Sequence, residues 1–363
     1  LKESNQILTE DAMKRFSILI AALCLCLTGC GKQTTEATAQ IFAMDTVMEV
    51  AAYGPKAEEA VQEAEGQIKA LENKLSRTKA DSDVSRVNHN GTTPTTGLTY
   101  GTRALLPAAL KYRDATNGAF DITIAPVMDA WGFTGDQFRV PEQSELDELL
   151  KYVNSDEIQI QEEPAYSVTL GEGQAIDLGG IAKGYTSDWV EQTFRANGIE
   201  SGKISLGGNV FVLGGKPDGS DWRVGIKDPR NESGLAAILS LRDAYAITSG
   251  GYERYFEENG KTYHHIIDPA TGYPADSGLL SVTVVAADNG PDWAGAGNGA
   301  MCDAFSTALF VMGEEQALDF WRNGGYDFDL VLVTEDGRVV ITAGLADRFE
   351  EVKDSGYTYE TVS

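Results

Sequence analysis

The sequence predicts an α+β fold, a single body of two intimately packed lobes with mixed or antiparallel sheets and flanking helices. Its 363 residues are 42% hydrophobic and 23% charged, which is typical of a globular protein large enough to bury an extended core. Strand-like patterns dominate the second half, and helical patterns are inserted among them without the regular alternation of parallel α/β folds. Together these observations favour α+β over a doubly wound sheet.

The first elements of the body are a strand and a long helix. Residues 41–53 alternate apolar and small side chains, as strands do, with an interruption at residues 44–46. After Pro55, apolar residues recur at helical spacing from Ala60 to Leu75, with acidic residues on the opposite face. Further helices are expected over about 102–116 and 182–197, a short one around 146–150, and short strands over 158–161, 166–170 and 175–178.

The second half is rich in short strands separated by glycine-containing turns, which is typical of antiparallel pairing. Two helices near its end precede a final pair of strands. The expected strands are 203–206, 209–213, 222–226, 237–241, 244–248, 262–267 and 280–286, followed by helices over 302–312 and 315–323 and strands over 329–334 and 339–342.

The N-terminal segment predicts that the protein is located outside the cytoplasm. Lys14 and Arg15 precede an apolar run at residues 16–27, too short for a stable membrane span, that ends in LTGC at 27–30. This ending resembles the bacterial lipobox, so Cys30 is the expected lipidation site; an ordinary secretory signal is the alternative. The predicted division is an upstream extension plus signal peptide (1–29), a lipidated Cys and flexible tether (30–40), the folded body (41–355) and a C-terminal tail (356–363).

Charge and cysteine content restrict the possible partners and stabilising bonds. Twenty-nine basic and 55 acidic side chains give a net charge of −26, which argues against nucleic acid as a partner. Once the signal is removed and Cys30 is lipidated, Cys302 is the remaining thiol, so no internal disulfide can form. An anionic ligand would have to be bound by backbone amides, a local Lys or a metal ion.

Glycine-rich segments are candidates for such a site. In DLGGIAKGY at residues 177–185, two glycines lie between a strand and a helix, where free backbone amides and Lys183 can bind phosphate. An ordinary strand–helix turn is the alternative. SLGGN at 205–209 and TSGG at 248–251 have the same character, and their repetition suggests several loops converging on one extended ligand.

Two other patterns carry potential chemistry. His264 and His265 are adjacent on a predicted strand, so their side chains point to opposite faces and at most one of them can face a site. Asp303 and Thr307 are four residues apart on a predicted helix, so both oxygens can reach one hard cation such as Mg²⁺. The alternative is that Asp303 is a helix cap and Thr307 is merely tolerated.

The ordered set of motifs resembles the FAD:protein FMN transferase family (ApbE-type flavin transferases) over roughly residues 41–350. Each motif alone has low specificity, but their order along the chain is highly specific. The matching segments are MDT at 44–46, GAFD at 118–121, DLGGIAKGY at 177–185, SLGGN at 205–209, TSG at 248–250, HIIDP with TG over 265–272, and DAFST at 303–307.

The resemblance implies a Mg²⁺-dependent enzyme that takes FAD, attaches FMN through a phosphoester to a Thr or Ser hydroxyl of an acceptor protein, and releases AMP. It also implies that the acceptor is a membrane-bound, flavin-dependent redox subunit. The catalytic residues would be Asp303, His265 and Lys183, and the metal ligands the Gly180 carbonyl, Asp303 and Thr307. The implied FAD contacts are Met44, Ala119, Phe120, Asp121, Asp177, Lys183, His265, Ile267 and Asp268.

Two departures from the family pattern keep other activities open. The more widespread Met-Gly-Thr is here Met-Asp-Thr, with Asp45 in place of glycine, and Thr78 stands where some relatives carry an aromatic residue that covers the flavin. A loosely covered flavin would leave open the balance between transfer to a protein and hydrolysis, so an FAD pyrophosphatase, which releases FMN and AMP, is one alternative. A non-catalytic FAD-binding lipoprotein is the other alternative.

Overall fold

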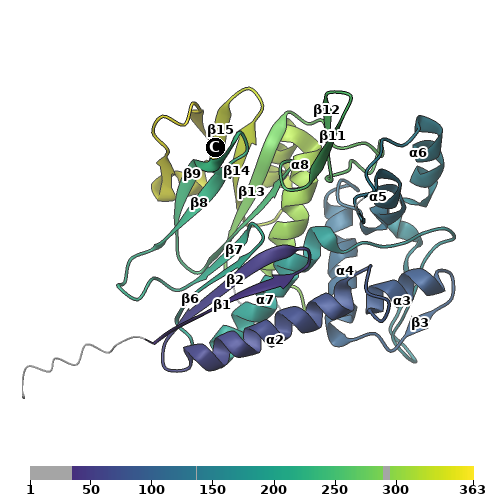
Figure 1. Ribbon diagram of the computed structural model, residues 1–363, viewed down its shortest axis with the longest axis horizontal. Helices are drawn as coiled ribbons and strands as arrows, with labels where there is room; N and C mark the ends of the chain where they lie inside the picture. Colours follow the sequence, from purple (N-terminus) through teal and green to yellow (C-terminus); the bar gives the residue numbers. More distant parts are fainter. Residues whose placement is uncertain (1–34, 136, 289–294) are drawn as a thin grey trace, which may run out of the picture. The chain divides into compact units, whose positions relative to one another are not determined.

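A computed structural model describes residues 35–363 except residue 136 and residues 289–294 (Figure 1). A compact unit extends from Glu36 to Ser363. The expected signal peptide, Cys30 and the first residues of the expected tether, up to residue 34, lie outside the described residues. Within the described part, no helix is both long and apolar enough to cross a bilayer.

A nine-stranded sheet is the largest sheet of the described residues, and it confirms the predicted α+β class. All neighbouring strands in it run antiparallel except β15 and β17, which are parallel. Its strands, in spatial order, are β1 (Glu36–Ala43), β2 (Thr46–Tyr53), β6 (Ser201–Leu206), β7 (Asn209–Leu213), β10 (Ala244–Gly250), β13 (Leu279–Ala287), β14 (Asp329–Thr334), β15 (Arg338–Thr342) and β17 (Thr358–Val362).

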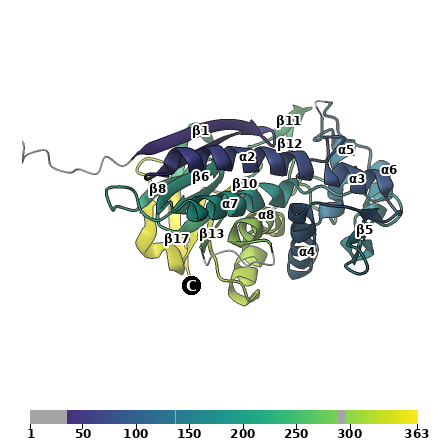
Figure 2. The same cartoon turned by 90° about the horizontal axis from the view of Figure 1, so that it is seen from below.

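Three long helices, α2 (Ala57–Leu75), α7 (Gly179–Ala196) and α8 (Asn298–Asn323), cover one face of this sheet (Figure 2). The apolar stripe predicted on α2 is buried against strands and α7. The two helices expected over 302–312 and 315–323 are both present within α8, where Gly313, whose backbone is non-helical with φ of +79°, separates them. The largest hydrophobic core lies between these helices and the sheet.

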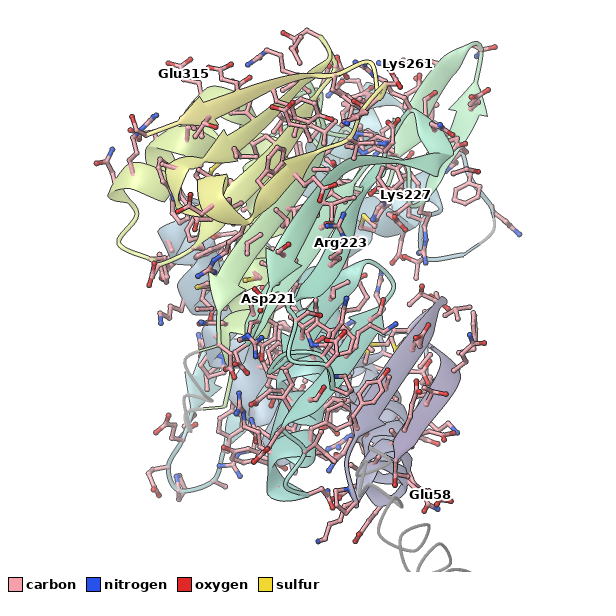
Figure 3. The ribbon with its side chains drawn as sticks, turned by 90° about the vertical axis from the view of Figure 1, so that its left-hand side faces the viewer. Glu58, Asp221, Arg223, Lys227, Lys261 and Glu315 are labelled. Carbon is pink, nitrogen blue, oxygen red and sulfur yellow. The ribbon has the colours of Figure 1, made fainter. Side chains whose placement is uncertain are left out.

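The opposite face is partly covered by a three-stranded sheet of β16 (Phe349–Glu351), β9 (Asn231–Leu241) and β8 (Trp222–Asp228). Residues of β8 alternate between buried and exposed, so Arg223 and Lys227 lie on the outer surface (Figure 3). A second core fills the space between the two sheets.

Both ends of the folded unit differ from the sequence-based division. Residues 36–40, expected in the tether, belong to β1, because Ala37 and Ala39 pack against the core and the strand pairs with β2. Residues 356–363, expected as a tail, contain β17, and the Tyr357 hydroxyl donates to Asp228 Oδ1 at 2.6 Å. Small and polar residues gave these strands too weak an apolar pattern to be recognised.

Shorter elements surround the end of the sheet where β1 meets β2. Residues 175–178, expected as a strand, are irregular, and α3, α5 and β11 were not predicted. A third, aromatic-rich core lies among α5, α6 and the β11–β12 hairpin. These elements are α3 (Asp83–Asn90), β3 (Thr95–Thr96), α4 (Tyr100–Ala115), α5 (Ala125–Trp131), α6 (Gln143–Leu149), β4 (Gln159–Gln161), β5 (Ser167–Thr169), β11 (Tyr255–Glu258), β12 (Lys261–His264), and 3₁₀ turns at Ile122–Ile124, Leu150–Tyr152, Ser155–Glu157 and Ala343–Arg348.

A two-residue turn joins β1 to β2 between the paired residues Ala43 and Thr46. Its residues Met44 and Asp45 have φ of +50° and +59°, the left-handed region that glycine adopts at lower cost. The Met44 amide donates to Glu72 Oε1 at 3.0 Å, which helps to hold the turn in this conformation. The interruption predicted at residues 44–46 is therefore a hairpin turn.

Asp45→Gly is expected to stabilise the protein by about 0.5–1 kcal/mol, because it removes left-handed strain at the second turn position. The Asp45 carboxylate is 79% exposed and 3.6 Å from the Arg254 guanidinium, an ion pair that contributes little in such a position. Urea unfolding of the two proteins measures the difference. A lower free energy of unfolding for Asp45→Gly would show that the ion pair outweighs the strain.

Candidate active site

A pocket of about 470 Å³ opens at the tip of the β1–β2 hairpin. Its walls come from segments that are distant in the sequence: the hairpin turn, the end of α2, the loop before Ile122, the start of α7, the loops after β10 and β12, and the middle of α8. The glycine-rich loops therefore converge on one cavity, as their repetition predicted. The predicted site residues in its lining are Met44, Ala119, Phe120, Asp121, Asp177, Gly180, Lys183, His265, Ile267, Asp303 and Thr307.

Helices α7 and α8 bring the three predicted metal ligands together. Asp303 and Thr307 lie on successive turns of α8, and a Cβ built on Gly180, in the first turn of α7, would be 3.5 Å from Thr307 Oγ1. Asp303 Oδ2 accepts a hydrogen bond from the Gly184 amide at 2.8 Å. In a regular helix the Gly184 amide donates to the Gly180 carbonyl oxygen. Because this amide donates to Asp303, the Gly180 carbonyl oxygen is less strongly engaged in the helix and more accessible to a cation.

This donor set suits a hard cation. It offers a carboxylate, a backbone carbonyl and a hydroxyl, which are ligands that Mg²⁺ accepts. The described residues contain no group of three or more His, Cys, Asp or Glu side chains placed to hold a metal. Because Mg²⁺ is octahedral, a cation bound by Gly180, Asp303 and Thr307 would retain coordination positions for ligand oxygens.

Ser249 belongs to the TSG motif at 248–250 but was not predicted as a site residue, and it contacts the turn of α8 that carries Thr307. Its Oγ lies 2.8 Å from Ser306 Oγ and 3.2 Å from Thr307 Oγ1, so β10 contacts the ligand-bearing turn of α8. The pairing of strand and helix orients the Thr307 hydroxyl.

Four basic side chains line the pocket of this strongly acidic protein, namely Arg77, Lys79, Lys183 and Arg254. Three of them have acidic neighbours: the distances are 2.6 Å from Arg77 to Asp129, 2.7 Å from Lys79 to Glu72 and 3.6 Å from Arg254 to Asp45. Among the described residues, no acidic side chain forms an ion pair with Lys183. Its ammonium group is thus available to an anionic ligand.

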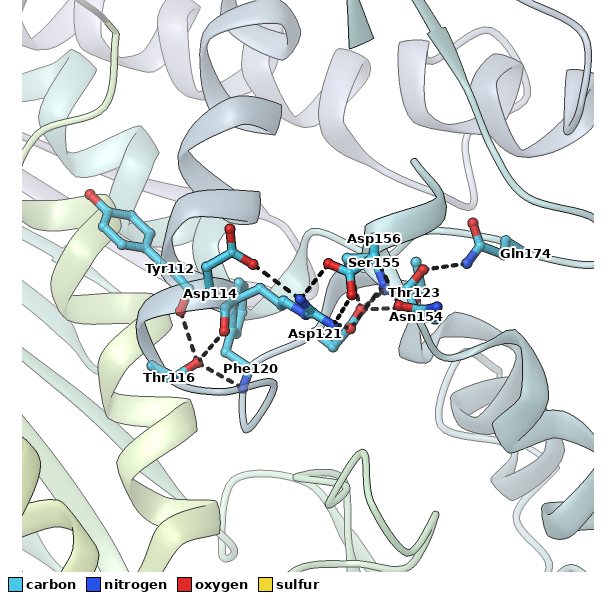
Figure 4. Close-up of polar contacts among 11 residues, drawn as sticks. Tyr112, Asp114, Thr116, Phe120, Asp121, Thr123, Asn154, Ser155, Asp156 and Gln174 are labelled. Atoms are coloured by element: carbon cyan, nitrogen blue, oxygen red, sulfur yellow. Dashed lines mark hydrogen bonds and ion pairs between the residues drawn. The ribbon is translucent and has the colours of Figure 1, made fainter. Parts of the chain in front are cut away.

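Two of the carboxylates predicted to contact FAD form hydrogen bonds within the protein. Asp121 Oδ1 accepts from the Thr123 amide at 2.8 Å and from Ser155 Oγ at 2.5 Å, and Arg113 lies beside it (Figure 4). Although Asp121 contributes to the pocket wall, its carboxylate is occupied in holding the adjacent loops together.

The Asp268 carboxylate also acts within its own turn, where it accepts from the Ala270 amide at 2.9 Å and from Thr271 Oγ1 at 3.0 Å. It is not among the residues that line the pocket, unlike its neighbours Ile267 and Pro269. Asp177 does line the pocket, and its Oδ1 accepts from the Gly179 amide at 2.7 Å where α7 begins.

The two adjacent histidines face different surroundings, as their spacing predicted. His264 Nε2 lies 3.1 Å from the Ala275 carbonyl and its Nδ1 accepts from the Ile266 amide, so both nitrogens are used structurally. His265 lines the pocket, and its Nδ1 lies 3.2 Å from the Arg254 carbonyl. Because a carbonyl only accepts, Nδ1 carries the hydrogen in the neutral ring and Nε2 is left as an acceptor.

Burial, together with the positive charges of Lys183 and Arg254, lowers the pKa of His265 to about 3. In the unfolded chain His265 has an ordinary pKa of 6.5 and takes up a proton first as the pH falls. His265 therefore makes folding less favourable between pH 6.5 and about 3.

His265→Gln is expected to make the free energy of unfolding less sensitive to pH. Between pH 7.5 and pH 5 this free energy should fall by about 2 kcal/mol less in His265→Gln than in the unaltered protein. Urea unfolding at both pH values measures this, and His89→Gln, at an exposed histidine, should behave like the unaltered protein. Equal losses for both variants would contradict a depressed pKa.

Comparison with known proteins identifies the family. The model of the ApbE family matches residues 44–330, which include the hairpin turn, the start of α7 and the ligand-bearing turns of α8. The chain belongs to the ApbE family. The matched region contains all three candidate metal ligands and the pocket histidine His265.

Relatives within the ApbE family share most of their length with this chain. A protein of Treponema pallidum named FAD:protein FMN transferase is 30% identical over 366 residues, 95% of this chain and 98% of the relative. A protein of Klebsiella pneumoniae with the same name is 33% identical over 294 residues, covering 80% of this chain and 86% of the relative.

Solved structures of the ApbE family have the same fold. The ApbE protein of Thermotoga maritima is 31% identical, with a TM-score of 0.75 over 88% of this chain and 97% of its own. The apo form of the flavinyl transferase ApbE of Pseudomonas stutzeri is 27% identical, with a TM-score of 0.69 over 88% of this chain and 94% of its own.

Proposed function

We propose that this chain is an FAD:protein FMN transferase that binds FAD in the pocket and passes its FMN moiety to a Thr or Ser hydroxyl of an acceptor protein. One observation carries the proposal: in a member of the ApbE family, Gly180, Asp303 and Thr307 line one pocket together with Lys183, which has no ion-pair partner among the described residues. This arrangement provides a place for the negatively charged pyrophosphate in a protein that is otherwise strongly acidic.

The reaction exchanges the phosphoanhydride bond of FAD for a phosphoester bond to the acceptor. The acceptor oxygen forms a bond to the phosphorus of the FMN half, the bond from that phosphorus to the bridging oxygen breaks, and AMP leaves with that oxygen. The hydroxyl proton is released. Because phosphoryl transfer depends mainly on positioning and charge stabilisation, the residues of the pocket need to hold the phosphates and align the hydroxyl.

The proposal assigns a separate role to the cation of Lys183, to the candidate metal ligands and to the candidate proton acceptors. Lys183 neutralises phosphate charge, whereas the amides of Gly179, Ile181 and Ala182 at the start of α7 already donate hydrogen bonds within the protein. Gly180, Asp303 and Thr307 would hold Mg²⁺, which neutralises pyrophosphate oxygens when bound. His265 and Asp303 are the two candidate proton acceptors: Nε2 of His265 carries no hydrogen but its lowered pKa makes the ring a weak base, and Asp303 Oδ2 already accepts from Gly184.

A second activity, hydrolysis of FAD to FMN and AMP, is favoured by Thr78. This residue lines the pocket with a small side chain whose hydroxyl lies 3.0 Å from Ser76 Oγ, whereas the family resemblance places an aromatic residue here in some relatives. Water then has access to the phosphorus in the absence of an acceptor. We propose hydrolysis as the slower side reaction.

The proposal extends to the cellular setting. Lipidation of Cys30 would anchor the enzyme outside the cytoplasmic membrane, where membrane-bound, flavin-dependent redox subunits are the fitting acceptors. Support comes from the basic residues, apolar run and LTGC ending of the N-terminal sequence.

Chromatography of the nucleotide products tests the proposal. The chain is incubated with FAD and Mg²⁺, with and without a candidate acceptor subunit, and AMP and free FMN are quantified. We expect AMP in excess of free FMN when acceptor is present, and no AMP after addition of EDTA. Equal AMP and FMN regardless of acceptor would establish a hydrolase, and unconsumed FAD would establish a binding protein.

A further inference from the structure

Asp188 lies in the interior of the protein, and the mechanism above does not use it. Its side chain is 3% exposed, on α7, two turns after Gly180 and one turn after Gly184. Its carboxylate accepts three backbone hydrogen bonds from the start of α8: from Gly297 at 2.9 Å, Gly299 at 2.7 Å and Ala300 at 3.1 Å. One side chain of α7 thus binds the free amides at the beginning of its neighbour.

The two helices are in backbone contact immediately beside this carboxylate. A Cβ at Gly184 would lie 2.0 Å from the Gly299 carbonyl oxygen, and one at Gly299 would lie 2.4 Å from the Gly184 carbonyl oxygen. One turn further along, Asp303 accepts from the Gly184 amide. The Asp188 bonds, the glycine contact and the Asp303 bond therefore form a continuous connection between α7 and α8.

This connection leads directly to the candidate metal ligands. On α8 the amides bound by Asp188 are followed by Asp303 and then Thr307, and on α7 the order runs from Asp188 back to Gly184 and Gly180. A shift of α8 along or away from α7 changes the separation of Gly180 from the other two ligands. The hydrogen bonds of Asp188 oppose such a shift.

We propose that Asp188 is a positioning residue that fixes the register of α8 on α7 and thereby sets the geometry of the Gly180, Asp303 and Thr307 cation site. This role rests on the proposed metal site. Asp188 acts through the helices and does not touch the cation or substrate.

Among the described residues, Glu191, the other acid on α7, forms no hydrogen bond with α8. Glu191, one turn after Asp188 and equally buried, pairs with Arg195 on its own helix. It is the matched control, since both residues are buried acids on α7 but only Asp188 is bonded to α8. Tyr245 on β10 also hydrogen-bonds to the Asp188 carboxylate, so it offers a milder way to disturb the same group.

The test measures binding of Mn²⁺ alone to the purified protein, by loss of the electron paramagnetic resonance signal of the free ion. Binding that Asp303→Ala removes defines the site. Asp188→Asn, which puts amide hydrogens against the α8 amides, should weaken Mn²⁺ binding at this site by at least 10-fold, while Glu191→Gln stays within 2-fold. In turnover with Mg²⁺, Asp188→Asn should require a higher Mg²⁺ concentration and recover most of kcat at saturation.

Unchanged Mn²⁺ affinity in Asp188→Asn would overturn the positioning role while leaving the metal site intact. Failure of Asp303→Ala to remove any Mn²⁺ would instead reject the metal site, and this role of Asp188 with it. If Asp188→Asn does not fold, Tyr245→Phe replaces it, with an expected 2- to 5-fold loss of affinity. An affinity equal to that of the unaltered protein would then overturn the proposal.

Discussion

Asp303→Ala is expected to lower the rate of AMP release from FAD about 1,000-fold or more. The substitution removes the one carboxylate of the candidate metal site and the acceptor of the Gly184 amide, so both cation binding and the α7–α8 contact are affected. FAD binding should weaken less, because Lys183 and the other pocket walls remain. Single-turnover release of AMP and flavin fluorescence measure the two effects separately.

Asp319→Ala is the control for this variant, since Asp319 is an exposed acid on the same helix and interacts with Asn323. It should retain the unaltered rate. Full AMP release by Asp303→Ala in the presence of Mg²⁺ would contradict the metal assignment.

Gly184→Ala is expected to destabilise the fold by about 2–4 kcal/mol and to abolish transfer in the protein that still folds. The added Cβ would be 2.0 Å from the Gly299 carbonyl oxygen and 2.6 Å from Asp303 Cβ. These neighbours are held by the backbone of α8, so relief requires the helices to separate. Thermal unfolding and AMP release report the two consequences.

Gly66→Ala makes the same chemical change in α2, where nothing lies within 4 Å of the added Cβ. It should leave activity unchanged and stabilise the protein by up to about 1 kcal/mol, because alanine has the higher helix propensity. Similar stability for Gly184→Ala and the unaltered protein would show that the α7–α8 contact is looser than the structure indicates.

Local patterns predicted much of this structure. The spacing of apolar residues from Ala60 to Leu75 specified the buried face of α2, and alternation identified most strands of the large sheet. The glycine motif at residues 177–185 was correctly placed at the start of a helix. Such features depend on neighbours within a few residues, and a single sequence records them directly.

Features that depend on long-range contacts were not predicted. Arg77 and Lys79 reach the pocket because α2 ends at its rim, and nothing in their local sequence distinguishes them from surface cations. The bond between the Asp121 carboxylate and Ser155 Oγ, 34 residues along the chain, was likewise not indicated by the sequence. Asp188 binds the amides of a helix more than 100 residues away, a partner that the sequence does not indicate.

The most direct test of the account is the intact mass of an acceptor subunit after incubation with this protein, FAD and Mg²⁺. We expect the acceptor to gain the mass of one FMN in phosphoester linkage, and we expect that gain to disappear with EDTA or with Asp303→Ala. An acceptor of unchanged mass, in a reaction where FAD is fully converted to AMP and free FMN, would contradict the transferase assignment.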